Sequence, residues 1–264
     1  MRPNTVRQRI REGRLALNCP SHIADPTVVE LIALAGFDSV LIDLEHDAID
    51  MDLAQRMIVA ADLSGITAIA RVPEGDWASA QKLLDAGAGG IQVAHTPTRA
   101  KAEEAVAAVR YPPLGRRGAS PGSRAARFGT IPWIEHMRTS NEEVLLNVMV
   151  EDREGLADLE EIASVEGVDL IVVGIGDLAG SLGITGNEAL IRTAVSDLAA
   201  RLRRVGKAKL GLAIGFSGLP LTIRDVKELG TVFSTINPTP ERRLLLTMTA
   251  AVKALREEEA ALSR

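Results

Sequence analysis

The sequence predicts a single (β/α)8 TIM barrel, an α/β fold, on three observations. The chain has 264 residues, close to the roughly 250 residues of a typical barrel of this kind. Short aliphatic runs alternate with helical stretches, and repeated strand–helix units favour a parallel sheet. Eight such units fit this length, which favours a closed barrel over an open doubly wound sheet. One domain is therefore expected over residues 1–264.

The expected strands are short runs rich in Val, Ile, Leu and Ala. The four clearest are residues 39–43, 67–72, 145–150 and 169–173. Several of the expected strands are apolar without alternation, as strands covered on both faces should be. Four weaker runs complete the set: residues 14–18, 90–93, 209–214 and 231–236. Their spacing leaves room for helices between them.

The helices are expected in these intervals. Asp25 followed by Pro26 is typical of a helix start, and Gly36 is typical of a helix end. Further helices are expected at residues 53–63, 77–86, 98–109, 153–164, 188–205 and 223–229. The arginine-rich N-terminus is expected to form a solvated opening helix rather than a secretion signal, because no apolar stretch follows it.

The last helix is expected over residues 239–261, with Thr239 as its cap and Pro240 at its first position. Its apolar residues form one stripe at helical spacing: Leu245, Met248, Val252 and Leu255. In contrast, residues 111–129 are rich in Gly, Pro and Arg and show no periodicity. Irregular segments of this length are often functional.

Composition excludes several classes of partner. Aromatic residues are 3% of the chain and the net charge is −5, so neither stacking platforms nor a basic excess points to nucleic acid. No apolar run approaches the roughly 18 residues that would indicate a membrane span. Cys19 is the only cysteine, which excludes an intramolecular disulfide and a cysteine-based metal site. A cytoplasmic location is expected.

Polar residues follow four of the expected strands. His46 and Arg71 are 25 residues apart, and Glu151 and Asp177 are 26 apart. Each interval is about one strand–helix unit, so each pair should lie on adjacent strands. The carboxyl ends of barrel strands carry the active site, and all four residues should therefore meet at one rim.

Glu151 and Asp177 offer hard oxygen ligands and suit Mg²⁺ or Mn²⁺. A 2-oxo acid could fill the remaining coordination positions, and the ion could stabilise negative charge on its 2-oxygen. The alternative is that each acid only caps a helix. The glycines near Asp177 could let the backbone approach an anion, although they match no known phosphate-binding pattern: Gly174, Gly176, Gly180 and Gly183.

Three further residues are candidates for chemistry. Arg71 could grip a carboxylate through two donors, or it could form a structural ion pair with Asp43 or Glu45. His46 suits proton transfer, although a lone histidine is often structural. Asp85 lies at the end of a helix, where the dipole disfavours a carboxylate, so it has either a special role or a tolerant surface position.

The irregular segment contains a group of arginines that could meet an anionic substrate, or that could be solvated: Arg116, Arg117, Arg124 and Arg127.

Several stretches together resemble the HpcH/HpaI family of class II pyruvate aldolases, from about residue 7 to residue 183. The matching stretches are GFDSVLIDLEH (36–46), ARVP (70–73), LLDAGA (83–88), RYPPLGRRG (110–118), EDREG (151–155), VEGVD (165–169) and GIGDLAGSLG (174–183). The combination is far more specific than any one piece. The resemblance implies a barrel of the phosphoenolpyruvate/pyruvate type.

The resemblance also implies roles by position. Glu151 and Asp177 would bind Mg²⁺, Mn²⁺ or Co²⁺, and Arg71 would bind the pyruvate carboxylate beside Gly176. His46 would transfer protons with Asp85 supplied by a neighbouring subunit. Asp43 and Glu45 would orient His46 and water on the metal. The usual assembly is a homohexamer, a trimer of dimers, with the last helix exchanged between barrels.

The implied reaction is reversible cleavage of a 4-hydroxy-2-oxo acid to pyruvate and an aldehyde, through a pyruvate enolate bound to the metal. Two alternatives remain open: a citrate-synthase-like condensation of oxaloacetate with acetyl-CoA, and a non-catalytic protein that binds 2-oxo acids.

The sequence also departs from the family around the substrate. Met149 replaces a common glutamine, so a hydrogen bond to the substrate could be missing. Ile175 and Ala179 replace a proline and a serine, and Ala94 and His95 stand where the family commonly has a proline and a methionine. Strand 231–236 ends at Asn237–Pro238 rather than in the usual pattern. These changes leave the predicted metal ligands intact, so enolate formation is better supported than the identity of the acceptor.

Overall fold

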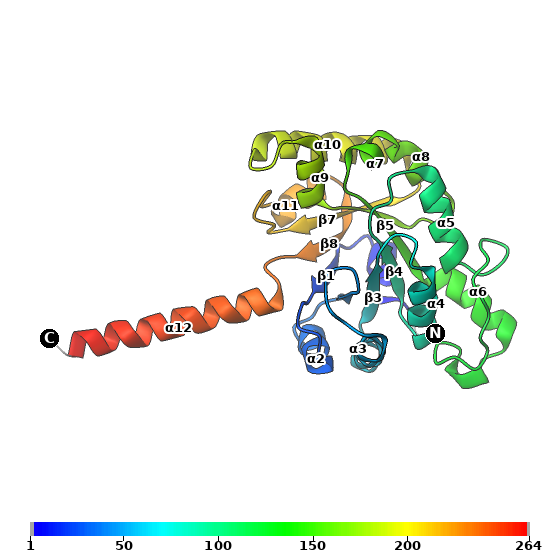
Figure 1. Ribbon diagram of the computed structural model, residues 1–264, viewed down its shortest axis with the longest axis horizontal. Coiled ribbons are helices and arrows are strands. Elements are labelled where there is room, and N and C mark those ends of the chain that lie inside the picture. Colours follow the sequence, from blue (N-terminus) through cyan, green and yellow to red (C-terminus); the bar gives the residue numbers. More distant parts are fainter. Residues whose placement is uncertain (1–2, 263–264) are drawn as a thin grey trace.

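The computed structural model describes residues 3–262 and shows a closed barrel of eight parallel strands (Figure 1). Consecutive strands pair, and β8 closes the barrel against β1. The strands are β1 (Ala16–Pro20), β2 (Ser39–Asp43), β3 (Thr67–Val72), β4 (Gly90–Val93), β5 (Leu145–Val150), β6 (Leu170–Val173), β7 (Lys209–Ile214) and β8 (Thr231–Ile236). The predicted (β/α)8 barrel is confirmed.

Helices surround the barrel and connect its strands (Figure 1). They are α2 (Pro26–Leu34), α3 (Met51–Ser64), α4 (Trp77–Ala86), α5 (Arg99–Val109), α6 (Trp133–Glu143), α7 (Arg153–Ala157), α8 (Leu159–Ser164), α9 (Ile175–Leu182), α10 (Glu188–Val205) and α11 (Ile223–Glu228). Two more flank the barrel in sequence: α1 (Thr5–Arg11) and α12 (Pro240–Leu262). Within residues 3–262, none of the helices combines the length and apolar character needed to cross a membrane.

Two apolar clusters hold the barrel together. The larger contains residues such as Val40 and Ile42 of β2, together with helix residues, and it lies between the strands and the helices. The smaller contains Leu41, Ile69 and Phe233 and fills the barrel interior. The change of cluster between neighbouring residues of β2 is the alternation expected of a strand.

The amino-terminal end of the barrel is closed by α1. Val6 is fully buried in the interior cluster. The side chain of Asn4 accepts hydrogen bonds from the N–H groups of Val6 and Arg7, and it donates to the carbonyl of Gly89. The expected opening helix is therefore present. It is not simply solvated, because Arg7 also pairs with Asp169 at 2.7 Å.

Some boundaries differ from the prediction. Strand β1 begins two residues later than expected, at Ala16, where it pairs with Phe233 of β8, while the Asp38 carboxylate accepts from the N–H of Leu17. The helix expected at 153–164 is two helices that meet at Asp158. Two helices, α6 and α9, were not predicted at all. The last helix runs one residue beyond its expected end.

Residues 111–129 are irregular, as predicted, apart from a short 3₁₀ turn at Arg127–Gly129. The segment lies against the end of α4. The N–H of Ala125 donates to the carbonyl of Asp85 at 3.0 Å, and Arg124 donates to the carbonyl of Ala86 at 3.2 Å. The irregular segment is thus fixed to the carboxyl end of one helix.

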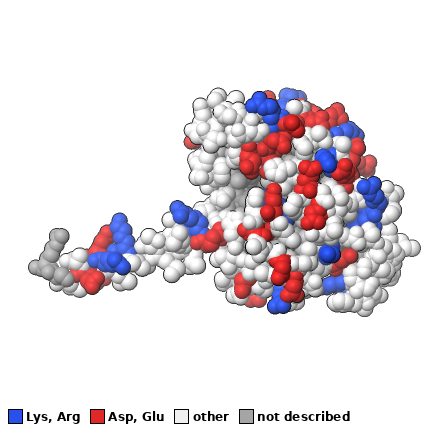
Figure 2. Space-filling model, in the orientation of Figure 1, with Lys and Arg blue, Asp and Glu red and all other residues white. Residues whose placement is uncertain are grey.

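Helix α12 projects away from the barrel (Figure 1). None of its described residues is buried. Between charged groups at its two ends, the middle of the helix is uncharged in Figure 2. That part carries the predicted stripe, in which Leu245 and Val252 are 54% and 50% exposed.

Candidate active site

A cavity of about 340 Å³ opens at the carboxyl ends of the strands. This is the end at which barrels of this type carry their active sites. The residues predicted from strand ends contribute six members of its lining: Asp43, His46, Arg71, Met149, Gly176 and Asp177. The prediction that these strand ends meet at one rim is confirmed for His46, Arg71 and Asp177, whereas Glu151 lies against Gly174 of the lining and is not itself part of it.

Glu151 directly follows β5 and is only 3% exposed. The N–H of His95 donates to its Oε1 at 2.7 Å. Gly174 lies against the Glu151 side chain and leaves room for it. A Cβ added to Gly174 would come within 2.6 Å of the Glu151 Cβ and still closer to Oε2. Burial raises the pKa of Glu151 above its ordinary value despite the contact with His95, and the charges of Glu45 and Asp177 raise it further.

Asp177 lies in the first turn of α9, where the helix dipole favours a carboxylate. It is exposed to the cavity, and it is close enough to Glu151 to raise the pKa of that group. A carboxylate pair in which the charge of Asp177 raises the pKa of Glu151 is well matched to a divalent cation, which would stabilise both charges. The donor set and the glycine that makes room for Glu151 therefore fit the predicted metal.

Arg71 lies near the end of β3 with its side chain 14% exposed. Its Nε donates to Oδ1 of Asp43 at 2.9 Å, and its Nη2 donates to Oδ2 of the same residue. Its Nε also lies 3.3 Å from Oε2 of Glu45. The ion pairs considered as an alternative role are thus present. Its Nη1 has no hydrogen-bond partner within residues 3–262 and remains available to a substrate carboxylate.

Asp43 organises the turn after β2. Besides Arg71, its carboxylate accepts from the N–H groups of Glu45 and His46. Burial alone would raise the pKa of Asp43, but the hydrogen bonds and charge of Arg71 outweigh it and hold the pKa below its ordinary value. The carboxylate is therefore ionised and fully engaged. The imidazole of His46 is 60% exposed and lies 3.7 Å from Glu45.

Asp85 and His46 share no hydrogen bond or ion pair within the chain as described. Asp85 instead pairs through Oδ1 with Nη2 of Arg117 at 2.7 Å. Arg117 is one of the four arginines of the irregular segment, and its side chain is fully buried. A role of Asp85 at this cavity would have to come from a neighbouring subunit, and this stays a prediction.

Several of the residues that depart from the family pattern lie at the cavity. Met149 lines the cavity and accepts a hydrogen bond at its Sδ from Gln92 at 3.2 Å. Ile175 also lines the cavity. His95 adopts a positive φ of 45°, which places its imidazole 3.4 Å from Glu151. Asn237 lines the cavity as well, so four of the departures lie at or beside the substrate space.

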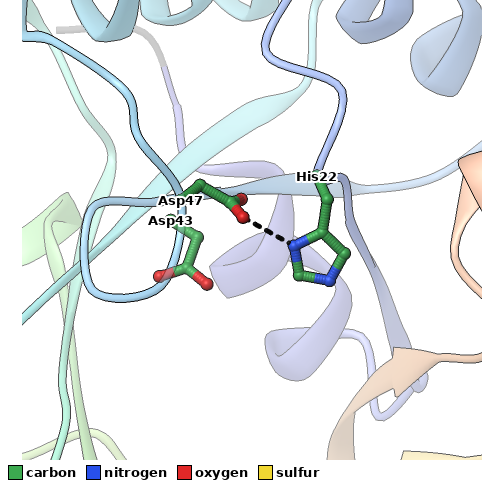
Figure 3. Close-up of side chains that lie close together, drawn as sticks. All are labelled: His22, Asp43 and Asp47. Carbon is green, nitrogen blue, oxygen red and sulfur yellow. Dashed lines mark hydrogen bonds and ion pairs between the residues drawn. The ribbon is translucent and has the colours of Figure 1, made fainter.

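The sequence analysis missed one pair of residues. His22 follows β1, Asp47 follows β2, and Nδ1 of His22 lies 2.8 Å from Oδ1 of Asp47 (Figure 3). The two are 25 residues apart, the same interval that separates His46 from Arg71. That spacing was the signal that could have revealed them.

His22, Asp43 and Asp47 offer oxygen and nitrogen atoms within 4.8 Å of one another, as a metal site would (Figure 3). Nevertheless, Asp43 already binds Arg71 through both oxygens and accepts two N–H groups. A cation there would lie next to the guanidinium. Glu151 and Asp177 form no hydrogen-bonded pair with an arginine or lysine among the described residues, and they stay the predicted metal ligands.

Comparison with known proteins decides the family. The model of the family described as HpcH/HpaI aldolase/citrate lyase matches residues 19–228. The chain belongs to the HpcH/HpaI family.

Relatives in this family are aldolases. A hydroxypyruvate/pyruvate aldolase from Pseudomonas aeruginosa is 36% identical over 90% of this chain and 95% of its own length. A 5-keto-4-deoxy-D-glucarate aldolase from Citrobacter koseri is 34% identical over 78% of this chain and 80% of its own length. The predictions of an enzyme, and of a carbon–carbon lyase of the aldolase type, are confirmed.

Solved structures of the HpcH/HpaI family have the same fold. A family protein from Burkholderia cenocepacia J2315 has a TM-score of 0.84 at 28% identity, covering 96% of this chain and 99% of that one. The citrate synthase SbnG has a TM-score of 0.83 at 28% identity, covering 96% and 97%. The fold therefore serves both aldol cleavage and a condensation.

Proposed function

We propose that the protein cleaves a 4-hydroxy-2-oxo acid reversibly to pyruvate and an aldehyde, using a divalent metal. The observation that carries this proposal is that Arg71 and Asp177 line one cavity and that Glu151 lies close enough to both for their charges to interact. Glu151 and Asp177 are carboxylates that form no ion pair with a lysine or arginine among the described residues, and Arg71 has donors to spare. A 2-oxo acid presents the complementary groups, a carboxylate and an adjacent carbonyl oxygen.

The chain's own residues bind and orient this substrate. Arg71 donates to the carboxylate, and its pairing with Asp43 fixes the direction of the guanidinium. Gly176, which has no side chain and is exposed at the start of α9, lets the carboxylate approach the backbone. Met149 closes the wall on the β5 side with an apolar surface.

His46 performs the proton transfer in this proposal. Its imidazole takes the proton of the 4-hydroxyl group as the C3–C4 bond breaks, and the aldehyde leaves. The electron pair of that bond becomes the pyruvate enolate, which takes a proton at C3. Asp85 of the partner subunit is proposed to orient His46, and Glu45 lies at its other side.

The proposed metal ligands are Glu151 and Asp177, with Mg²⁺, Mn²⁺ and Co²⁺ as candidate ions. When bound, the ion would supply Lewis-acid stabilisation of the negative charge that develops on the 2-oxygen.

The resemblance to SbnG supports a second candidate, condensation of oxaloacetate with acetyl-CoA. Both candidates would bind a 2-oxo acid in the same half of the cavity. In the condensation, however, this acid would be the electrophile, attacked at C2 by the enolate of acetyl-CoA, whereas in the aldol reaction it supplies the enolate. Release of free CoA from acetyl-CoA in the presence of oxaloacetate would identify this activity.

Exchange of the C3 protons of pyruvate in D₂O tests the proposal most directly, because it needs no aldehyde. We expect exchange with Mg²⁺, Mn²⁺ or Co²⁺, none with EDTA, and none in Arg71→Ala. Retro-aldol activity is then measured with pyruvate and a panel of aldehydes. Exchange that survives in Arg71→Ala would contradict the proposed mechanism.

Assembly and location also belong to this proposal. The exposed stripe of α12 supports exchange of this helix between barrels, in a homohexamer built as a trimer of dimers. Such an assembly would also bring Asp85 to a neighbouring cavity. A cytoplasmic location stays a prediction.

A further inference from the structure

His22 and Asp47 form a pair at the mouth of the cavity that the proposed reaction does not use. The imidazole Nδ1 lies 2.8 Å from Oδ1 of Asp47 (Figure 3). The Asp47 side chain is only 14% exposed. Its second oxygen, Oδ2, is buried without a hydrogen-bond partner among the described residues. The contact with His22 is thus the main polar contact that holds this carboxylate.

The pairing determines which ring nitrogen is free. An ionised aspartate only accepts hydrogen bonds, so the neutral imidazole carries its proton on Nδ1, facing Asp47. Nε2 is then an acceptor. It has no hydrogen-bond partner within residues 3–262, and His22 lines the cavity with its side chain 48% exposed. The pair therefore presents one fixed acceptor to a ligand.

The position of the pair separates it from the enolate half of the site. In a closed barrel of eight strands, β1 lies across from β5 and β2 lies across from β6. Glu151 and Asp177 follow β5 and β6, whereas His22 and Asp47 follow β1 and β2. One cavity reaches both Asp177 and His22. A pyruvate enolate held at the ends of β5 and β6 would thus have its partner substrate between itself and the ends of β1 and β2.

We propose that His22, oriented by Asp47, recognises a hydroxyl group on the acceptor aldehyde. This proposal rests on the aldolase function proposed above. A hydroxyl group can donate to Nε2, whereas the methyl group of an equally large aldehyde would leave that acceptor without a partner. A carboxylate is a poorer match, because the ionised Asp47 lies directly behind the ring. The favoured acceptors are therefore small hydroxyaldehydes.

The experiment compares two aldehydes of equal size as partners of pyruvate: glycolaldehyde, which has the hydroxyl group, and propanal, which lacks it. We expect the unmodified protein to prefer glycolaldehyde in kcat/KM. His22→Phe keeps a planar ring without the acceptor, and it should lower the ratio of the two kcat/KM values about tenfold or more. His22→Gln, whose amide oxygen can accept, should restore part of the ratio.

Asp47→Asn tests the orientation of the ring. The amide would donate to Nδ1 and shift the ring proton to Nε2, so the preference for glycolaldehyde should fall as it does in His22→Phe. Asp52→Asn is the matched control, because Asp52 is an exposed carboxylate on α3 that pairs only with Arg56. The control should keep the original ratio.

Pyruvate C3 exchange is measured on every variant. Exchange in His22→Phe shows that the enolate half is intact, and an unchanged aldehyde ratio in that variant would overturn the assignment of His22. No exchange in the unmodified protein would overturn the proposed function itself, and this proposal with it.

Discussion

Arg117 holds Asp85 from a buried position, with 2.7 Å between Nη2 of the guanidinium and Oδ1 of the carboxylate. The guanidinium also lies over the ring of Tyr111, 4.5 Å from its centroid. Its Nε and Nη1 are buried without partners among the described residues. The irregular segment thus supplies the arginine that fixes Asp85 at the end of α4.

If Asp85 acts at a neighbouring cavity, Arg117→Met should lower kcat about tenfold or more, through misplacement of the carboxylate. The KM for pyruvate should change little, because Arg71 and the metal ligands are untouched. Steady-state kinetics with pyruvate and an aldehyde check this. In an Asp85→Asn background, the same substitution should have little further effect on kcat. Additive losses would mean that Arg117 acts by another route.

Gly174 provides a test of the metal site without removal of a ligand. Gly174→Ala should displace Glu151, because the added Cβ would approach the Glu151 side chain to within 2.6 Å. We expect at least a tenfold weaker affinity for Mn²⁺ in a calorimetric titration. Gly180→Ala, in the same helical segment, meets nothing within 4 Å. It should bind Mn²⁺ as the unmodified protein does, and equal affinities for both variants would argue against Glu151 as a ligand.

Asp43 should make the fold sensitive to acid. Its pKa is held below the ordinary value by Arg71, so its contribution is present above the pKa of the unfolded chain and is lost as pH falls through the lower folded value. Asp43→Asn should reduce the free energy of unfolding at pH 7 by about 3 kcal/mol, since it leaves Arg71 short of a partner. When urea unfolding is measured between pH 7 and pH 3, the free energy of unfolding of this variant should fall less steeply toward acid pH than that of the unmodified protein.

The stripe on α12 should support assembly. Leu255→Glu places a charge on the stripe, where Leu255 is 66% exposed in the single chain, and it should shift the protein toward smaller species in light scattering. Ala250→Glu adds the same charge to the opposite side of the helix and should leave the molar mass unchanged. If both variants keep the mass of the unmodified protein, α12 is not the contact.

The regular parts of the barrel could be predicted from sequence because strands covered on both faces are continuous apolar runs. Six of the eight strands have the predicted limits, and a seventh, β6, begins one residue later than predicted. In contrast, β1 is displaced, since its limits depend on pairing with Phe233 and on Asp38, two contacts from outside the segment. Helix α9 was missed because Gly176 and Gly180 lower helix propensity, which the packing of Ile175 and Leu178 overrides.

The residues that line the cavity could be predicted only in part from the sequence. Strand-end spacing placed His46, Arg71 and Asp177 correctly at one rim. The same spacing links His22 to Asp47, but it could not show that their side chains are in contact, because the path of two loops decides this. Nor could it show that Asp85 is held by Arg117, a residue 32 positions away in the irregular segment.

The two walls of the cavity come from opposite sides of the barrel, and their sequences are separate in the chain. His22 and the loop residues around it could therefore be diversified while Asp43, His46, Arg71 and residues 149–177 are kept, so that the electrophile changes and the nucleophile does not. Every member of such a library would keep the residues proposed to form the pyruvate enolate. Pyruvate exchange could then screen for folded catalysts before any new aldehyde is tried.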